Sequence, residues 1–183
     1  MKSQGDYSAA ADRFRPVAQR YCSLVDSAVT QDKTEFLIQV YRMLPELVGE
    51  AMRLPAVEFG EDEDEQMGFD QSHSDPGKSF EQHKQLYDAL KQKLGDWDLY
   101  WQVFDPTKDN EAIRGSLADD IAGVYGDMKE GLDYMKSDEV LPRDALFEWR
   151  LGFYSHWGRH AINALYTIHT VLNETLELLD SPD

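Results

Sequence analysis

The sequence has little cysteine, few basic residues and no long hydrophobic run. Cys22 is the single cysteine among 183 residues, which excludes a disulfide framework and a cysteine-based zinc site. No apolar run approaches the ~18 residues that cross a bilayer. The N-terminal stretch also lacks the apolar core of a secretory signal. We therefore expect a soluble protein that resides in the cytoplasm.

Charge of one sign dominates the chain. It carries 18 lysines and arginines against 35 aspartates and glutamates, for a net charge of -17. Such a balance argues against direct binding to nucleic acids or anionic membranes, which requires clustered basic residues. Residues 56–77 contain eight of the acidic residues and no lysine or arginine. We expect this segment to be an acidic mobile loop within a single helical domain, residues 1–183, and any partner of the loop to be a protein with a basic surface.

Apolar residues recur with helical periodicity nearly throughout, and no segment shows convincing strand alternation. Two capping patterns, Asp32 with Glu35 and Ser116 with Asp119, mark helix starts, and Pro45 should kink or divide the second helix. The expected helices span residues 6–29, 32–53, 78–94, 97–104, 116–137 and 143–179. Short connections favour antiparallel neighbours, so the predicted fold is an all-α, up-and-down bundle of five or six helices with a flexible acidic insertion.

The four tryptophans fall at spacings that predict burial in the core. They are Trp97, Trp101, Trp149 and Trp157. A stacking platform for nucleic acid would need neighbouring basic residues, and these are scarce. The sequence also contains no glycine-rich phosphate loop, nucleophile elbow or zincin signature. No residue is therefore assigned a catalytic role, and the sequence favours a protein that is not an enzyme.

Polar side chains line one border of each of the last two long helices. His156 and His160 are one turn apart, and Asp120 and Asp127 are two turns apart on the preceding helix. If the two borders meet, two carboxylates face two imidazoles, with Glu148 nearby. These are the ligand types of a carboxylate–histidine metal site, although the paired Glu-x-x-His motifs of known bundle metal sites are missing.

Three interpretations of this candidate polar cluster remain open. Its members are Asp120, Asp127, Glu148, His156, Arg159 and His160. They could be buried hydrogen-bonded groups that fix helix register. They could bind a divalent metal ion as a cofactor through His156, His160 and Asp120. They could instead hold a small anion or polar ligand with the help of Arg114, Arg150 and Arg159.

Three segments in combination carry a family resemblance. They are Tyr100–Pro106, Gly115–Asp120, and Glu148–Arg150 with His156–His160. The chain resembles, from about Phe14 to Leu172, a bacterial all-helical family catalogued as domain of unknown function 5063. The resemblance implies a soluble bacterial helical protein and supplies no activity, cofactor or catalytic residue.

Two functions from different classes fit these observations. The first is a non-catalytic interaction or regulatory module that binds another protein through surface helices or the acidic loop. The alternative is a metal-dependent or small-ligand-binding helical bundle that uses the carboxylate and histidine cluster. Such a bundle could be a hydrolase. A mimic of nucleic acid that occupies a basic partner is a third interpretation of the negative charge.

Overall fold

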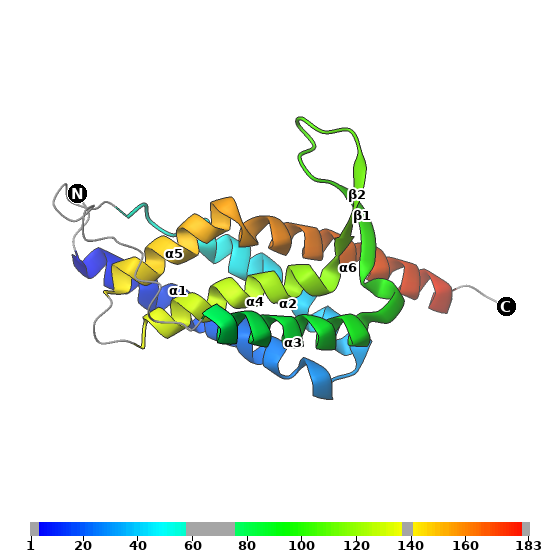
Figure 1. Cartoon of the computed structure of the whole chain (residues 1–183), viewed down its shortest axis with the longest axis horizontal. Helices are drawn as coiled ribbons and strands as arrows, with labels where there is room; N and C mark the ends of the chain where they lie inside the picture. The colour runs from blue at the N-terminus through cyan, green and yellow to red at the C-terminus, as the bar shows by residue number, and fades with distance from the viewer. Residues whose placement is uncertain (1–3, 58–75, 137–140, 181–183) are drawn as a thin grey trace.

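A computed structural model describes residues 4–57, 76–136 and 141–180 (Figure 1). Within these ranges it contains six α-helices and one two-stranded antiparallel sheet. The elements are α1 Gln4–Asp26, α2 Lys33–Ala51, α3 Pro76–Leu94, β1 Leu99–Val103, β2 Ala112–Ser116, α4 Leu117–Tyr134, α5 Pro142–Ser155 and α6 Trp157–Asp180. The acidic loop expected at 56–77 lies, from residue 58 to 75, outside the described residues.

The helices lie side by side along the long axis of the molecule, and the β1–β2 hairpin projects away from them near α6 (Figure 1). Helix α4 is central, because it packs against α1, α3, α5 and α6. The predicted helical class is confirmed in this broad form. The β1–β2 hairpin is the part of the described fold that an all-α class does not include.

Both predicted helix starts are confirmed. The Asp32 side chain accepts hydrogen bonds from the backbone N–H groups of Thr34 and Glu35, at 2.9 and 3.2 Å. Ser116 Oγ accepts one from the N–H of Asp119 at 3.2 Å. Each bond satisfies an N–H group that the first helical turn leaves without a backbone partner. Because Ser116 fixes the first residue of α4, it also fixes which α4 residues face α6.

The helix predicted at 97–104 is wrong, as is the expectation that the chain has no strand. Residues 99–103 form β1, which pairs with β2 in a register that places Tyr100 opposite Gly115 and Trp101 opposite Arg114. The alternation was missed because it is inverted. The outward Trp101, which is 64% exposed, is more apolar than the inward Tyr100 and Gln102, whose polar groups bond to α4 and α6. The predicted burial of Trp101 is therefore wrong as well, whereas Trp149 and Trp157 are fully buried.

The single helix predicted at 143–179 is in fact two helices that meet at His156. The backbone of His156 adopts φ -143° and ψ -84°, which ends α5 before α6 begins. The chain passes itself closely here, because a Cβ atom on Gly158 would lie 2.1 Å from the carbonyl oxygen of Phe153. Only glycine fits such an approach. Helix α2, by contrast, continues through Pro45 without being divided.

The core runs between the helices and receives buried side chains from all six of them. Its largest fully buried side chains include Phe14, Tyr21, Trp149 and Trp157. Trp149 packs so closely on α4 that a Cβ atom on Gly131 would lie 2.1 Å from its Nε1 atom. This tight contact fixes α5 against α4.

Candidate functional site

Asp120 and His160 form a hydrogen-bonded pair between α4 and α6. Asp120 lies in the first turn of α4 and is only 2% exposed. Its Oδ1 atom is 2.7 Å from Nδ1 of His160. This hydrogen bond raises the pKa of His160. Burial raises the pKa of Asp120, and the hydrogen bonds from His160 and Tyr100 oppose that rise. The pair therefore holds its proton more firmly than a free imidazole would.

Tyr100 is a third member of this group that sequence analysis missed. Its hydroxyl donates to Oδ2 of Asp120 at 2.5 Å, from the inward face of β1. Burial, and then the bond to Asp120, raise the pKa of the phenol. Gly115 makes room for the ring, because a Cβ atom there would lie 2.5 Å from Tyr100 Cζ. Tyr100 could have been found only by predicting a strand pair that sets it opposite Gly115. The helix predicted at 97–104 excluded that pairing.

Asp127 and His156 form a second pair of the same kind. Oδ2 of Asp127 lies 2.8 Å from Nδ1 of His156. The helix break at His156 allows its ring to reach α4, and half of its side chain remains exposed. Burial raises the pKa of Asp127. A Cβ atom on Gly152 would lie 2.6 Å from Oδ1 of Asp127, so the glycine is explained by close packing around the carboxylate.

The two pairs bring the imidazole rings together. The ring centroids of His156 and His160 are 4.8 Å apart, with the planes at 68°. In both rings Nδ1 is taken by a carboxylate, and Nε2 has no hydrogen-bond partner among the described residues. A ring held in this way can transfer a proton or bind a metal ion through Nε2. We call Tyr100, Asp120, Asp127, His156 and His160 the polar seam.

Glu148 is near the seam without joining either histidine. It is half-buried, and burial together with the carboxylates of Glu130 and Asp127 raises its pKa. No three histidine, cysteine, aspartate or glutamate side chains in the described part of the chain are placed to hold one metal ion. The structure therefore brings together four of the predicted residues, Asp120, Asp127, His156 and His160, as two pairs.

The three arginines considered for an anion site are dispersed over different rings. The guanidinium of Arg159 lies 3.9 Å from the centroid of Phe104, and that of Arg114 lies 5.1 Å from Trp101. Arg150 lies 5.0 Å from the centroid of Tyr154 and donates to the carbonyl oxygen of Leu54 at 2.7 Å. The arrangement thus offers separate stacked cations instead of one arginine-lined anion site.

A second region of interest lies where the hairpin meets α6. Gln102 accepts a hydrogen bond from Asn163 at 2.7 Å, which ties β1 to α6. Around this tie, large apolar side chains and two arginines are exposed to solvent. We define the hairpin surface as Leu99, Trp101, Phe104, Ile113, Arg114, Arg159, Ile162 and Tyr166. Sequence analysis missed it because it expected the aromatic residues of 97–104 to be helical.

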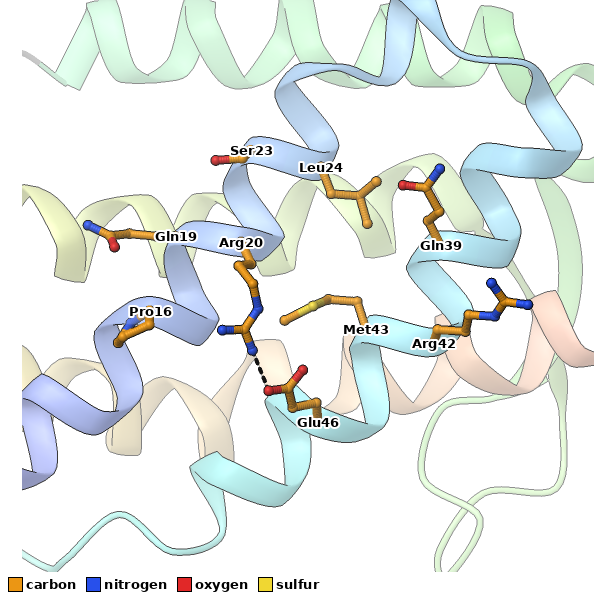
Figure 2. Close-up of a pocket in the computed structure, with 9 residues that line it drawn as sticks. All are labelled: Pro16, Gln19, Arg20, Ser23, Leu24, Gln39, Arg42, Met43 and Glu46. Atoms are coloured by element: carbon orange, nitrogen blue, oxygen red, sulfur yellow. Dashed lines mark hydrogen bonds and ion pairs between the residues drawn. The ribbon is translucent and has the colours of Figure 1, made fainter.

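An open groove of about 650 Å³ separates α1 from α2 (Figure 2). An ion pair between Arg20 and Glu46 closes it on one side, and Leu24 and Met43 face each other beside that pair. Arg42 lies on its rim. The groove contains no histidine and belongs to a different helix pair from the seam. It is therefore a surface feature separate from the histidine–carboxylate pairs.

Cys22 is not a nucleophile in this structure. The residue is 5% exposed, and burial raises the pKa of its thiol to about 12. A thiol reacts as its thiolate, which is scarce at neutral pH at this pKa. The polar seam and the hairpin surface are therefore the two candidate functional regions in the described part of the chain.

A family model described as a domain of unknown function (DUF5063) matches residues 5–174. The chain belongs to this family. The predicted resemblance is confirmed, and the match spans the seam, the hairpin and all but the last residues of α6. No curated protein matches the chain. Within the described helices of this family member, none has the length and apolar character needed to span a membrane.

The fold is shared with a solved structure. The crystal structure of protein BF1032 from Bacteroides fragilis superposes with a TM-score of 0.64 at 20% sequence identity. The alignment covers 86% of this chain and 89% of that chain. At this identity the likeness shows a common fold and nothing about activity.

Proposed function

We propose that this protein is a non-catalytic interaction module that binds another protein through the hairpin surface. The observation that carries the proposal is the exposure of Trp101 and Phe104, each stacked with an arginine, on a hairpin that projects from the bundle (Figure 1). Tryptophan, tyrosine and arginine are the residues that dominate binding energy at protein interfaces. Exposed apolar patches of this kind mark binding sites in soluble proteins.

The hairpin contributes a second argument, from its backbone. A two-stranded sheet leaves both outer edges without backbone partners, and exposed edges of this kind pair with strands of other chains. Neither strand contains the lysine or proline with which proteins usually protect an edge. An isolated hairpin is also marginally stable in water. Here the Gln102–Asn163 and Tyr100–Asp120 hydrogen bonds hold it against the bundle, which keeps its outer face in a fixed position.

The charge of this surface indicates the chemistry of the partner. Arg114 and Arg159 have no carboxylate within ion-pair distance among the described residues, although the chain as a whole carries -17. A partner segment with carboxylates beside apolar side chains would satisfy both guanidinium groups. A second copy of this chain fits less well, because a symmetric contact places the same patch on both sides and this patch contains no carboxylate to pair with the arginines. The proposed occupant is therefore a different protein.

Two finer features of the proposal rest on sequence alone. The first is a cytoplasmic, bacterial setting, which stays a prediction from the sequence. The acidic segment 56–77 could engage a basic surface of the same partner. Weakening of the complex between low and moderate salt would support that second contact, since exposed charges are screened by salt.

A photo-crosslinking amino acid at position 166, where Tyr166 is 72% exposed and Trp101 is left in place, tests the proposal in cells that naturally make the protein. We expect one discrete adduct with another protein, and its loss when Arg114→Glu is added. The matched control places the same crosslinker at Val29, which is 77% exposed on a different part of the chain. Equal adducts at positions 29 and 166, or an adduct between two copies of this chain, would contradict the proposal.

A ligand-binding function of the seam is a second candidate. It is favoured by the two histidines that carboxylates hold through Nδ1. A hydrolytic activity would need a metal ion or a general base at the same place. The two functions use different residues, because the hairpin surface and the seam share none, and Trp101 and Arg114 lie on the face of the hairpin opposite to Tyr100.

A further inference from the structure

We propose that His156 and His160 form an open binding site for one divalent transition-metal ion, with Nε2 of each imidazole as a ligand. This site goes beyond the interaction function and does not depend on it. The ions of this class that prefer imidazole are Zn²⁺, Cu²⁺ and Ni²⁺.

The first argument is the state of each ring. A carboxylate on Nδ1 makes that nitrogen the N–H donor, and Nε2 of the neutral ring then carries the free lone pair. Asp127 holds His156 in this way at 2.8 Å, and Asp120 holds His160 at 2.7 Å. Metal-binding histidines almost always donate their other nitrogen to a carboxylate or carbonyl, which orients the ring and raises its basicity. Both rings already have this second partner.

The second argument is the distance between the rings. A metal–nitrogen bond of about 2.1 Å places the ion roughly 3.2 Å from the ring centroid. A nitrogen–metal–nitrogen angle near the tetrahedral value then separates the two centroids by about 5 Å. The observed separation is 4.8 Å. The rings thus have the spacing of two imidazoles on one ion.

The third argument is that packing fixes both rings before any ion binds. A Cβ atom on Gly123 would lie 3.3 Å from Cδ2 of His160, so the ring rests closely on α4. Gly152 makes room for the carboxylate that holds His156. Ligands whose partners and packing already fix them lose little conformational freedom on binding.

The site is open because the chain supplies only two ligands. No third metal-binding side chain of the types considered converges with them in the described residues. The His156 side chain is 52% exposed, so water or a group from another molecule can reach the ion from that side, as in catalytic zinc sites, which keep a position open. We expect weaker binding than at a three-ligand site, and one ion per chain.

Calorimetric titration of the full-length, tag-free chain with zinc chloride at about pH 8, after treatment with EDTA and buffer exchange, tests the site. We expect one ion per chain. His156→Ala and His160→Ala should each weaken binding by at least about tenfold. Asp127→Asn should weaken it by about tenfold with the fold intact, because second-partner changes cost 10–100-fold in affinity.

His169→Ala is the matched control, since His169 is an exposed histidine of α6 bonded to Tyr41 instead of a carboxylate. Its zinc affinity should stay within about twofold of the unaltered chain. Circular dichroism establishes that each variant is folded. If His160→Ala does not fold, Asp127→Asn takes its place in the test. Absence of zinc binding by the folded chain, or binding that survives in the His156→Ala/His160→Ala double variant, would overturn the proposal.

Discussion

Tyr100 and Trp101 are neighbours in β1, yet they belong to regions with opposite character. The hydroxyl of Tyr100 points inward and donates to a carboxylate that is 2% exposed. The indole of Trp101 points outward, is 64% exposed and stacks with the exposed Arg114. In the polar seam the Tyr100 hydroxyl, both carboxylates and Nδ1 of each imidazole are hydrogen-bonded within the chain, and Nε2 of each imidazole is not. On the hairpin surface the apolar side chains are exposed, and among the described residues the guanidinium groups have ring contacts and no carboxylate partner.

This difference separates groups that maintain the fold from groups available to other molecules. A buried polar group contributes to stability only while its partner is present, and it becomes costly once the partner is removed. An exposed aromatic residue contributes little to stability, and its burial becomes favourable when another protein covers it. Substitutions in the two regions should therefore have opposite effects on the stability of the fold and on binding of the partner protein.

The largest effect should follow from Asp120→Ala. It leaves the Tyr100 hydroxyl and His160 Nδ1 without their partner, and loss of one member of a buried charged pair costs about 3–5 kcal/mol. Unfolding in urea measures the change. Asp119→Ala, one residue away and exposed, is the control and should cost less than about 1 kcal/mol. Equal losses for the two variants would remove the distinction between the seam and its surroundings.

A smaller loss should follow from Tyr100→Phe. The ring and its packing against Gly115 remain, while Asp120 loses one hydrogen bond donor. We expect the free energy of unfolding to fall by about 1.5–3 kcal/mol, the range for a hydrogen bond to a charged group. Thermal or urea unfolding measures it. An unchanged stability would show that this hydroxyl does not hold the hairpin to α4.

Stability should hardly change in Trp101→Ala. Exposed substitutions remain within about 0.5 kcal/mol, and the indole is exposed on the outer face of the hairpin. The same unfolding experiment measures it, and the crosslinked adduct, formed with the crosslinker at Tyr166, should disappear. A loss above about 1.5 kcal/mol would place Trp101 among the residues that maintain the fold.

The alkaline absorbance titration should show no contribution from Tyr100 near pH 10. Burial and the bond to Asp120 raise the pKa of its phenol, so the hydroxyl keeps its proton where a free tyrosine loses it. The unaltered chain and Tyr100→Phe should therefore give the same phenolate absorbance up to about pH 10.5. A difference with a midpoint at or below pH 10 would contradict the buried hydrogen bond.

Helix starts were predictable because their causes are local. Asp32 and Ser116 cap helices through N–H groups two or three residues away, and a short stretch of sequence contains all the partners. The strand was not predictable in this way. Trp101 pairs with Arg114, thirteen positions along the chain, so the reason for its conformation lies outside its own segment.

The candidate site shows the same limit. Helical spacing placed two carboxylates and two histidines along facing borders, and the structure brings them together as pairs. The spacing assumed one continuous helix, whereas the ring of His156 reaches Asp127 from the end of α5. The break depends on the close approach of Gly158 to Phe153, and Tyr100 depends on strand pairing. Neither contact follows from helical periodicity.

The size of the native complex tests the central claim most directly. Cells that make the protein are lysed gently, and the lysate is fractionated by size with the chain detected by antibody. The account predicts that the unaltered chain elutes well above its own 21.0 kDa and that purified chain elutes as a monomer. The Trp101→Ala/Arg114→Glu variant should elute at monomer size with an unchanged melting temperature. If that variant is equally stable and still elutes with the large complex, the hairpin surface is not the binding site.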